Sequence, residues 1–209
     1  MISRILAQLH RPVYEKRLDV LTEMISPHLE SGDHVLDVGC GSGALGARLI
    51  AANAAKGVIV DGLEKHPRGG EPIRVIAYPG ETFPLANDSY DVVIVADVLH
   101  HEQEPEKLLR EAVRVSRRLV IIKDHQVNGP FAQARISLID WAANAPYGVP
   151  CLYRYNTPAQ WTETIQRYRL EPVRRCDSMN LYPSGVNLLF GRKLQFLVVG
   201  RVNKMPAPS

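Results

Sequence analysis

The stretch from Val35 to Gly46, VLDVGCGSGALG, constrains the fold of this chain more than any other part of its 209 residues. An apolar segment runs into closely spaced glycines and continues into the helical segment ALGARLIAANAA. Glycines in this setting form a tight turn and let the backbone come close to a ligand at the start of a helix. The stretch therefore predicts a strand, a ligand-binding glycine turn and a helix.

Short apolar segments alternate with helical ones from His34 to Asp124. The predicted strands are HVLDVG, GVIVDGLE, IRVIAY, DVVIVADV and LVIIKD, and the predicted helices are ALGARLIAANAA and EPEKLLREAVRVSRR. An unbroken apolar run such as DVVIVADV is typical of a strand that is buried on both faces. Because such strands and helices are joined by right-handed crossovers, the pattern predicts an α/β fold with a doubly wound, mostly parallel sheet.

The two ends of the chain depart from this alternation. An apolar stripe predicts a helix in the first thirty residues, with the members Leu18, Leu21, Met24, Ile25 and Leu29. Residues 130–145 predict one further helix, and TPAQ at 157–160 fits the start of another. RLEPVRRC and LQFLVVGRV bring the expected number of strands to seven. The connection between them, YPSGVNLLFGRK, is too short and too rich in Gly and Pro for a crossover helix, so we expect an antiparallel C-terminal strand.

Length and composition limit the classes of protein to consider. We expect one domain over residues 1–209, with an N-terminal helical cover at 1–30, an inserted lid-like segment at 126–156 and a tail at 203–209. The net charge of +3 is interleaved along the chain, so nucleic acid is not expected as a partner. No apolar run suits a membrane span, and MISRILAQLHRPVYEK does not resemble a signal peptide, which predicts a cytoplasmic protein. The 3 widely spaced cysteines predict neither disulfides nor a metal site, and nothing fixes the oligomeric state.

The glycine turn matches two fingerprints that imply different ligands. Read from Asp37 it is D-x-G-x-G-x-G, whereas Gly41, Gly43 and Gly46 form the G-x-G-x-x-G of dinucleotide-binding proteins. The glycines serve the same purpose in both and cannot separate them. Asp37 does, because a carboxylate at the end of the strand suits a cationic ligand group and repels a phosphate at the helix N-terminus.

Two motifs in register resemble one enzyme family. Asp37 to Gly43, DVGCGSG, resembles motif I of class I S-adenosylmethionine-dependent methyltransferases, and FPLANDSYDVVIVADVLHH resembles a stretch of their type 11 small-molecule branch. The resemblance covers about residues 33–124. It implies a Rossmann-like methyltransferase fold, S-adenosylmethionine as cofactor, and in-line transfer of a methyl group to a small-molecule acceptor.

The resemblance also implies a set of cofactor-binding residues. The family has an acidic residue at the end of the second strand that holds the ribose, and Glu64 in GVIVDGLEK is favoured for it over Asp61. Pro79 stands where the family often has an aspartate for adenine, so backbone groups near Glu81 and Thr82 are expected to take that role, with an exposed loop carboxylate as the alternative for Glu81. The candidates are Asp37, Gly39, Cys40, Gly41, Gly43, Glu64, Glu81, Thr82 and Asp97, with Cys40 also interpreted as a small buried filler.

Two histidines are the candidates for contact with the acceptor. His101 matches the usual histidine of the family, for which orienting the loop or capping the next helix is an alternative to catalysis. His125 follows the fifth strand beside the lid-like segment and is the stronger candidate. The alternative is that KDH, residues 123–125, forms a turn in which Asp124 caps the structure that follows. The aromatics of the lid-like segment either wall an acceptor pocket or pack onto the sheet; they are Trp141, Tyr147, Tyr153 and Tyr155. Cys151 is interpreted as structural.

Two other functions fit parts of the sequence. A nicotinamide-dependent oxidoreductase would use the second fingerprint but leaves Asp37 and SYDVVIVADVLHH unexplained. A non-catalytic S-adenosylmethionine-binding protein is the other alternative, because Pro79 and VSRRLVII depart from the family pattern. Methylation of a nucleobase amino group is not expected, since ADVLH stands where those enzymes carry D/N-P-P-Y/F.

Overall fold

One seven-stranded sheet forms the centre of the described structure. The computed structural model describes residues 2–67, 69–145, 148–149 and 151–204, with the backbone alone for residues 2–11. In spatial order the strands are β3 (Arg74–Ala77), β2 (Ile59–Glu64), β1 (His34–Val38), β4 (Tyr90–Ala96), β5 (Ser116–His125), β7 (Gln195–Val202) and β6 (Leu170–Cys176). The first five strands along the chain are parallel to one another, and β7 is antiparallel to both β5 and β6. The predicted doubly wound, mostly parallel sheet with an antiparallel C-terminal strand is confirmed.

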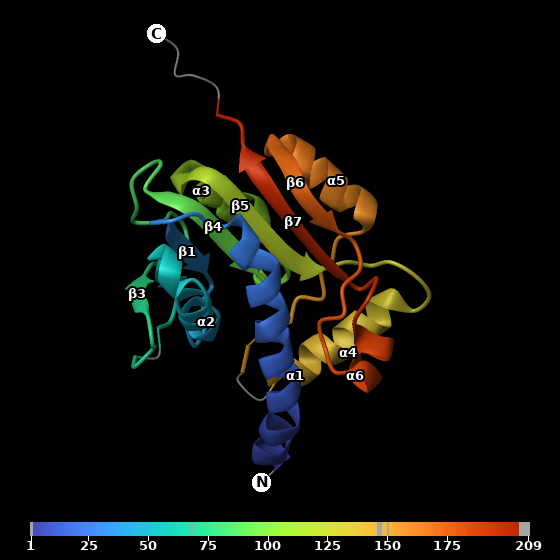
Figure 1. Ribbon diagram of the computed structural model, residues 1–209. Helices are drawn as coiled ribbons and strands as arrows, with labels where there is room; N and C mark the ends of the chain where they lie inside the picture. The colour runs from blue at the N-terminus through green and yellow to red at the C-terminus, as the bar shows by residue number, and fades with distance from the viewer. Residues whose placement is uncertain (1, 68, 146–147, 150, 205–209) are drawn as a thin grey trace.

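Helices cover both faces of this sheet (Figure 1). They are α1 (Ile2–Ile25), α2 (Ala44–Ala52), α3 (Pro105–Val115), α4 (Ala132–Asn144), α5 (Pro158–Arg167) and α6 (Ser184–Phe190), with short 3-10 turns η1 (Ser26–His28), η2 (Ala54–Lys56) and η3 (Leu99–His101). Buried side chains of α1 and α2 share one core cluster with the strands, and those of α3 and α5 share the other. Figure 1 shows α4 and α6 beyond the end of the sheet toward which β5 points.

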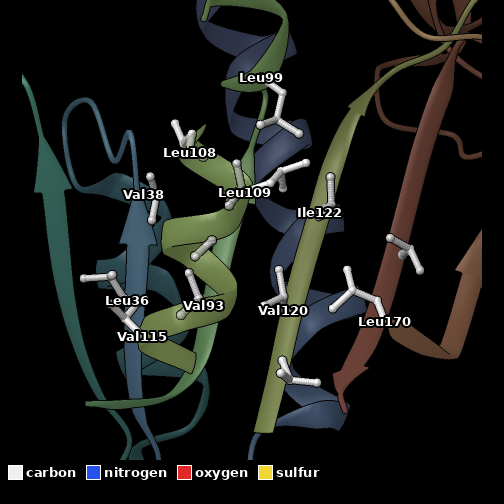
Figure 2. Close-up of a cluster of buried hydrophobic side chains, with 14 of the residues drawn as sticks. Leu36, Val38, Val93, Leu99, Leu108, Leu109, Val115, Val120, Ile122 and Leu170 are labelled. Carbon is white, nitrogen blue, oxygen red and sulfur yellow. The ribbon is translucent and has the colours of Figure 1, made fainter. Parts of the chain in front are cut away.

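Strand alternation divides the core between the two faces. Figure 2 shows Leu36 and Val38 of β1 on the same side of the sheet as Leu108 and Leu109 of α3. Val35, one position away, belongs to the cluster of α1 and α2 on the other face. The predicted stripe of the N-terminal helix is buried against that second cluster, as its periodicity requires.

Local sequence sets where α3 and α5 begin. Pro105 occupies the first turn of α3, where its missing N–H costs nothing. Thr157 caps α5, and its side chain and that of Gln160 form the predicted capping box with the backbone. Both starts lie where the sequence predicts them.

Two of the alternative interpretations for the second half of the chain do not hold, whereas the expectation about the connection before β7 does. As expected, the connection between β6 and β7 is not a crossover, because the two strands are antiparallel; it contains one short helix, α6. KDH forms no turn, because β5 continues through His125 and pairs there with β7. Trp141 and Tyr153 do not pack onto the sheet, since they are 52% and 42% exposed; Tyr147 lies outside the described residues. No described helix combines the length and the apolar character needed to cross a membrane.

Candidate functional site

The glycine turn between β1 and α2 has the backbone that its sequence predicts. Gly39, Gly41 and Gly43 have φ angles of 66°, 56° and 70°, in the left-handed region that favours glycine. A Cβ atom on Gly39 would lie 2.5 Å from Cγ2 of Val98, whereas one on Gly41 would have nothing within 4 Å. The turn is therefore closely packed at Gly39 and leaves open space beside Gly41, where a ligand has room.

Asp37 is a buried carboxylate with one oxygen that no described group pairs. The residue lies in β1 and is 3% exposed, and its Oδ2 has no hydrogen-bond partner in the described part of the chain. Burial raises the pKa of Asp37 to about 7, with Arg17 opposing the change and Glu64 adding to it. Because an unpaired buried charge is unfavourable, this position fits the ammonium group at the methionine end of S-adenosylmethionine.

The two acidic candidates of β2 face opposite sides of the sheet. Asp61 and Glu64 are three positions apart, and side chains of a strand alternate between its faces. Oε2 of Glu64 accepts a hydrogen bond of 2.9 Å from the Gly41 N–H. Oδ2 of Asp61 instead accepts one of 2.8 Å from the Tyr90 hydroxyl and lies 3.0 Å from Nε2 of His34. The structure thus brings Glu64, and not Asp61, to the glycine turn.

Cys40 and Gly46 pack the turn and α2 onto the sheet. Cys40 is buried with its sulfur against Gly62 of β2, and burial raises the pKa of its thiol to about 12. A Cβ atom on Gly46 would lie 2.7 Å from Cδ1 of Ile73. Cys40 is therefore a protonated packing residue in this structure, and Gly46 allows α2 to lie close to the strands.

Asp97 joins three elements through partly buried ion pairs. Nε of Arg17, in α1, donates to Oδ2 at 2.9 Å, and Nζ of Lys123, in β5, donates to Oδ1 at 2.5 Å. Burial raises the pKa of Asp97, but the two cations outweigh it and hold the pKa well below its usual value. Asp97 also has a φ of 58°, a conformation that is costly for a residue with a side chain. Both of its oxygens are engaged by this chain's own cations.

The loop after β3 begins beside the end of β2. The Tyr78 N–H donates to the Glu64 carbonyl at 3.2 Å, so the loop starts next to the proposed ribose carboxylate. The side chains of Glu81 and Thr82 are exposed, and those of Tyr78 and Phe83 on either side are buried. The structure therefore anchors the loop by its ends and leaves the two adenine candidates at the surface.

Histidines and carboxylates from separate segments meet beyond the ends of β4 and β5. Nδ1 of His100 lies 2.5 Å from Oδ1 of Asp124, and its Nε2 lies 3.5 Å from Oδ1 of Asp140 in α4. Nε2 of His101 lies 3.6 Å from the same Asp140 oxygen, and the Tyr155 hydroxyl donates to Oδ2 at 2.6 Å. Burial lowers the pKa of His100, but Asp124 and Asp140 raise it to about 10.

His125 is a buried, neutral imidazole. Burial and the Lys123 charge lower its pKa to about 4. Nε2 of Gln195 lies 3.2 Å from Nδ1 of His125 and also donates to the Phe190 carbonyl. Because an amide NH2 group can only donate, Nδ1 accepts and the ring proton is on Nε2. In this tautomer Nε2 of His125 is a hydrogen-bond donor, and Nδ1, which is paired with Gln195, is not free to take a proton.

A cavity of about 370 Å³ lies between the start of α3, the end of β5 and α5. His100, Asp124, His125, Tyr155 and Trp161 are among its lining residues. Among the described residues of the lid-like segment, only 154–156 line it. The cavity thus combines apolar walls with the polar groups at the ends of β4 and β5.

Sequence reasoning missed Arg17, Asp140 and Gln195. Asp140 had a detectable signal, because it continues the four-residue spacing of Ala132 and Ile136 and is buried with them in α4. A carboxylate in the buried stripe of a helix indicates a partner inside the fold. Arg17 and Gln195 had no such local signal, since their partners are 80 and 70 positions away.

Part of this chain is similar in sequence to known proteins. Residues 36–121 match the profile of the methyltransferase domain of type 11. An uncharacterized methyltransferase of Mycobacterium ulcerans (strain Agy99) is 30% identical over 137 residues, which cover 62% of this chain and 54% of that protein. A ubiquinone biosynthesis O-methyltransferase of Cereibacter sphaeroides (strain ATCC 17029 / ATH 2.4.9) is 26% identical over 179 residues, with 76% and 72% covered.

Solved structures share the fold. The 1,6-didemethyltoxoflavin-N1-methyltransferase of Burkholderia thailandensis, solved with S-adenosylhomocysteine, aligns with a TM-score of 0.63 at 16% identity, over 96% of this chain and 88% of that one. The chain spans about half the length of the first curated relatives that it matches. The profile match, the relatives and the sheet order agree with the motifs in the sequence. Residues 36–121 are therefore a methyltransferase domain of the class I, type 11 family, whose cofactor is S-adenosylmethionine.

Proposed function

We propose that this protein transfers the methyl group of S-adenosylmethionine to a small-molecule acceptor. One observation carries the proposal: Asp37 buries a carboxylate oxygen without a partner among the described groups, beside the glycine turn that leaves space at Gly41. A cationic ligand group satisfies that oxygen, whereas the pyrophosphate of a dinucleotide would be repelled by it.

The residues around the turn bind different parts of the cofactor. Asp37 binds the ammonium of the methionine end, and Gly39, Gly41 and Gly43 give the backbone room to approach. Glu64, held against the turn by the Gly41 N–H, accepts hydrogen bonds from the ribose hydroxyls. Backbone groups near Glu81 and Thr82 receive the adenine, since their loop, which follows β3, begins beside the end of β2.

The chemistry needs positioning more than acid or base catalysis. S-adenosylmethionine, when bound, supplies an electrophilic methyl group whose leaving group needs no proton. The cavity aligns the acceptor atom and excludes water, which is how an in-line displacement gains most of its rate. The Nε2–H of His125 orients an acceptor oxygen or nitrogen by donating to it. Oδ2 of Asp124 is buried and has no partner among the described groups. It accepts a hydrogen bond from the O–H or N–H of a hydroxyl or amine on the acceptor molecule.

The small-molecule acceptor is supported by the size and lining of the cavity. A cavity of about 370 Å³ falls within the range of small-ligand sites, roughly 300–1,000 Å³. The relative named for ubiquinone biosynthesis and the neighbour solved with 1,6-didemethyltoxoflavin both act on small organic molecules according to their names. The three free cysteines support a reducing, cytoplasmic location.

Calorimetry followed by a transfer assay tests the proposal. S-adenosylhomocysteine should bind with one site per chain and NAD should not bind; the opposite result would assign a nicotinamide-dependent oxidoreductase. Cofactor labelled in its methyl group should then label a compound in a small-metabolite extract. Tight S-adenosylhomocysteine binding without any transfer would indicate a non-catalytic binding protein and refute methyl transfer.

A further inference from the structure

We propose that His100, His101 and Asp140 form a binding site for a divalent transition-metal ion at the end of the sheet. Nε2 of His100 lies 3.5 Å and Nε2 of His101 lies 3.6 Å from Oδ1 of Asp140. All three ligand atoms lie within 4.8 Å of one another. Tetrahedral Zn²⁺, with bonds of about 2.0–2.1 Å, places its ligands roughly 3.4 Å apart, so the cluster has nearly the spacing that an ion requires.

The three ligand residues have hydrogen-bond partners that are typical of a metal site. Metal-binding histidines usually donate their other ring nitrogen to a carboxylate, which fixes the tautomer and the ring orientation. Nδ1 of His100 has such a partner in Asp124 Oδ1, at 2.5 Å, which leaves Nε2 directed at Asp140. Oδ2 of Asp140 is held by the Tyr155 hydroxyl at 2.6 Å. The Asn144 amide donates to Oδ1 at 2.7 Å, and the second lone pair of that oxygen is left for an ion.

The burial of Asp140 needs a balancing positive charge. Its side chain is 1% exposed and that of Asp124 is 2% exposed, so two carboxylates lie inside the protein within reach of His100. Buried carboxylates are retained when they are paired or coordinate a metal. A proton on His100 and the buried Lys123 ammonium, which attracts Asp124, supply positive charge to this pair, and a divalent ion at the cluster would replace that proton and add one further charge.

The donor set selects among metal ions. Imidazole nitrogens suit Zn²⁺ and Fe²⁺, while Mg²⁺ and Ca²⁺ require oxygen ligands. Two imidazoles and one carboxylate leave at least one coordination position open. The site also joins η3, which follows β4, to α4 of the lid-like segment, so bound metal would fasten that helix to the end of the sheet. The proposal does not depend on methyl transfer.

Metal content and Co²⁺ spectroscopy test the site. Full-length protein treated with chelator and dialysed should take up one Zn²⁺ per chain in a calorimetric titration, with Mg²⁺ giving no heat of binding. Co²⁺ should give visible absorption bands of four- or five-coordinate intensity, and anaerobic Fe²⁺ competing for that signal would show which ion binds more tightly. His101→Gln and Asp140→Asn should each weaken Zn²⁺ binding at least tenfold. His66→Gln, which removes an exposed imidazole outside the cluster, should bind as the wild type does.

Two results would overturn the site. One is the absence of saturable Zn²⁺ or Fe²⁺ binding by the wild-type chain. This measurement does not require that any variant folds. The other is Zn²⁺ binding by His101→Gln and Asp140→Asn equal to that of His66→Gln, with circular dichroism showing all of them folded. S-adenosylhomocysteine affinity, measured on the same samples, separates this outcome from a failure of the proposed methyl transfer.

Discussion

Replacing Asp37 by asparagine should stabilise the ligand-free protein at pH 8 and abolish most of its affinity for the cofactor. Burial raises the pKa of Asp37 from 3.8 to about 7. A carboxyl whose folded pKa is raised contributes stability below its unfolded pKa and loses it as the pH rises to the folded pKa. The wild-type chain therefore loses stability between about pH 4 and pH 7 through this group, whereas the uncharged amide of the Asp37→Asn variant does not titrate and loses none.

The size of the effect follows from the shift. Each pKa unit corresponds to about 1.4 kcal/mol, so a shift of about 3 units is worth up to about 4 kcal/mol. Since the buried amide has its own desolvation cost, we expect a gain of about 2–4 kcal/mol at pH 8. For a chain of this length that raises the melting temperature by roughly 5–15 °C. At pH 5, about 1.2 units above the unfolded pKa, the wild type has lost only about 1.6 kcal/mol through this group, so the two proteins should melt within a few degrees.

Thermal denaturation at pH 5 and pH 8, with and without S-adenosylhomocysteine, measures both halves of the prediction. The ligand should raise the melting temperature of the wild type far more than that of Asp37→Asn. Asp33→Asn is the matched control, because Asp33 is 6% exposed but paired with Arg118 at 2.6 Å, and its loss should destabilise the protein at pH 8. A variant Asp37→Asn that is less stable than wild type at pH 8, or that keeps the full response to ligand, would refute the reasoning.

Three further substitutions test the site. Glu64→Ala should weaken S-adenosylhomocysteine binding in calorimetry by about 1–3 kcal/mol, while Asp61→Ala should chiefly lower thermal stability; the reverse pattern would show that the wrong carboxylate is assigned to the ribose. His125→Ala should lower the rate of methyl transfer with little change in cofactor affinity, and an unchanged rate would remove it from the acceptor site. Gly46→Ala should cost about 1–3 kcal/mol in urea denaturation, because the new Cβ would lie 2.7 Å from Ile73, and a neutral effect would mean that α2 can shift at no cost.

The sequence predicts those parts of the fold that local patterns determine. The parallel strands, the glycine turn and the capping box of α5 all depend on neighbouring residues, and all are confirmed. The choice between Asp61 and Glu64 was also within reach, because their odd separation puts them on opposite faces and only one face carries the glycine turn.

Contacts between distant segments could not be read from the sequence in the same way. His100 meets Asp124 and Asp140 only because η3, β5 and α4 converge at one end of the sheet. The ion pair of Arg17 with Asp97 depends on the path of α1 across the sheet. Trp141 is exposed and does not pack onto the sheet, which was one of the two alternatives, because Ala132, Ile136 and Asp140 form the buried side of α4.

The placement of β7 has a consequence for the order of assembly. This strand is the last in the sequence, yet it lies between β5 and β6 and is hydrogen-bonded to both. During synthesis on the ribosome, β5 remains an open edge and β6 has no strand to pair with until residues 195–202 emerge. An open apolar edge invites pairing with other chains. The nascent chain is therefore exposed to aggregation through this edge in the interval before β7 is inserted.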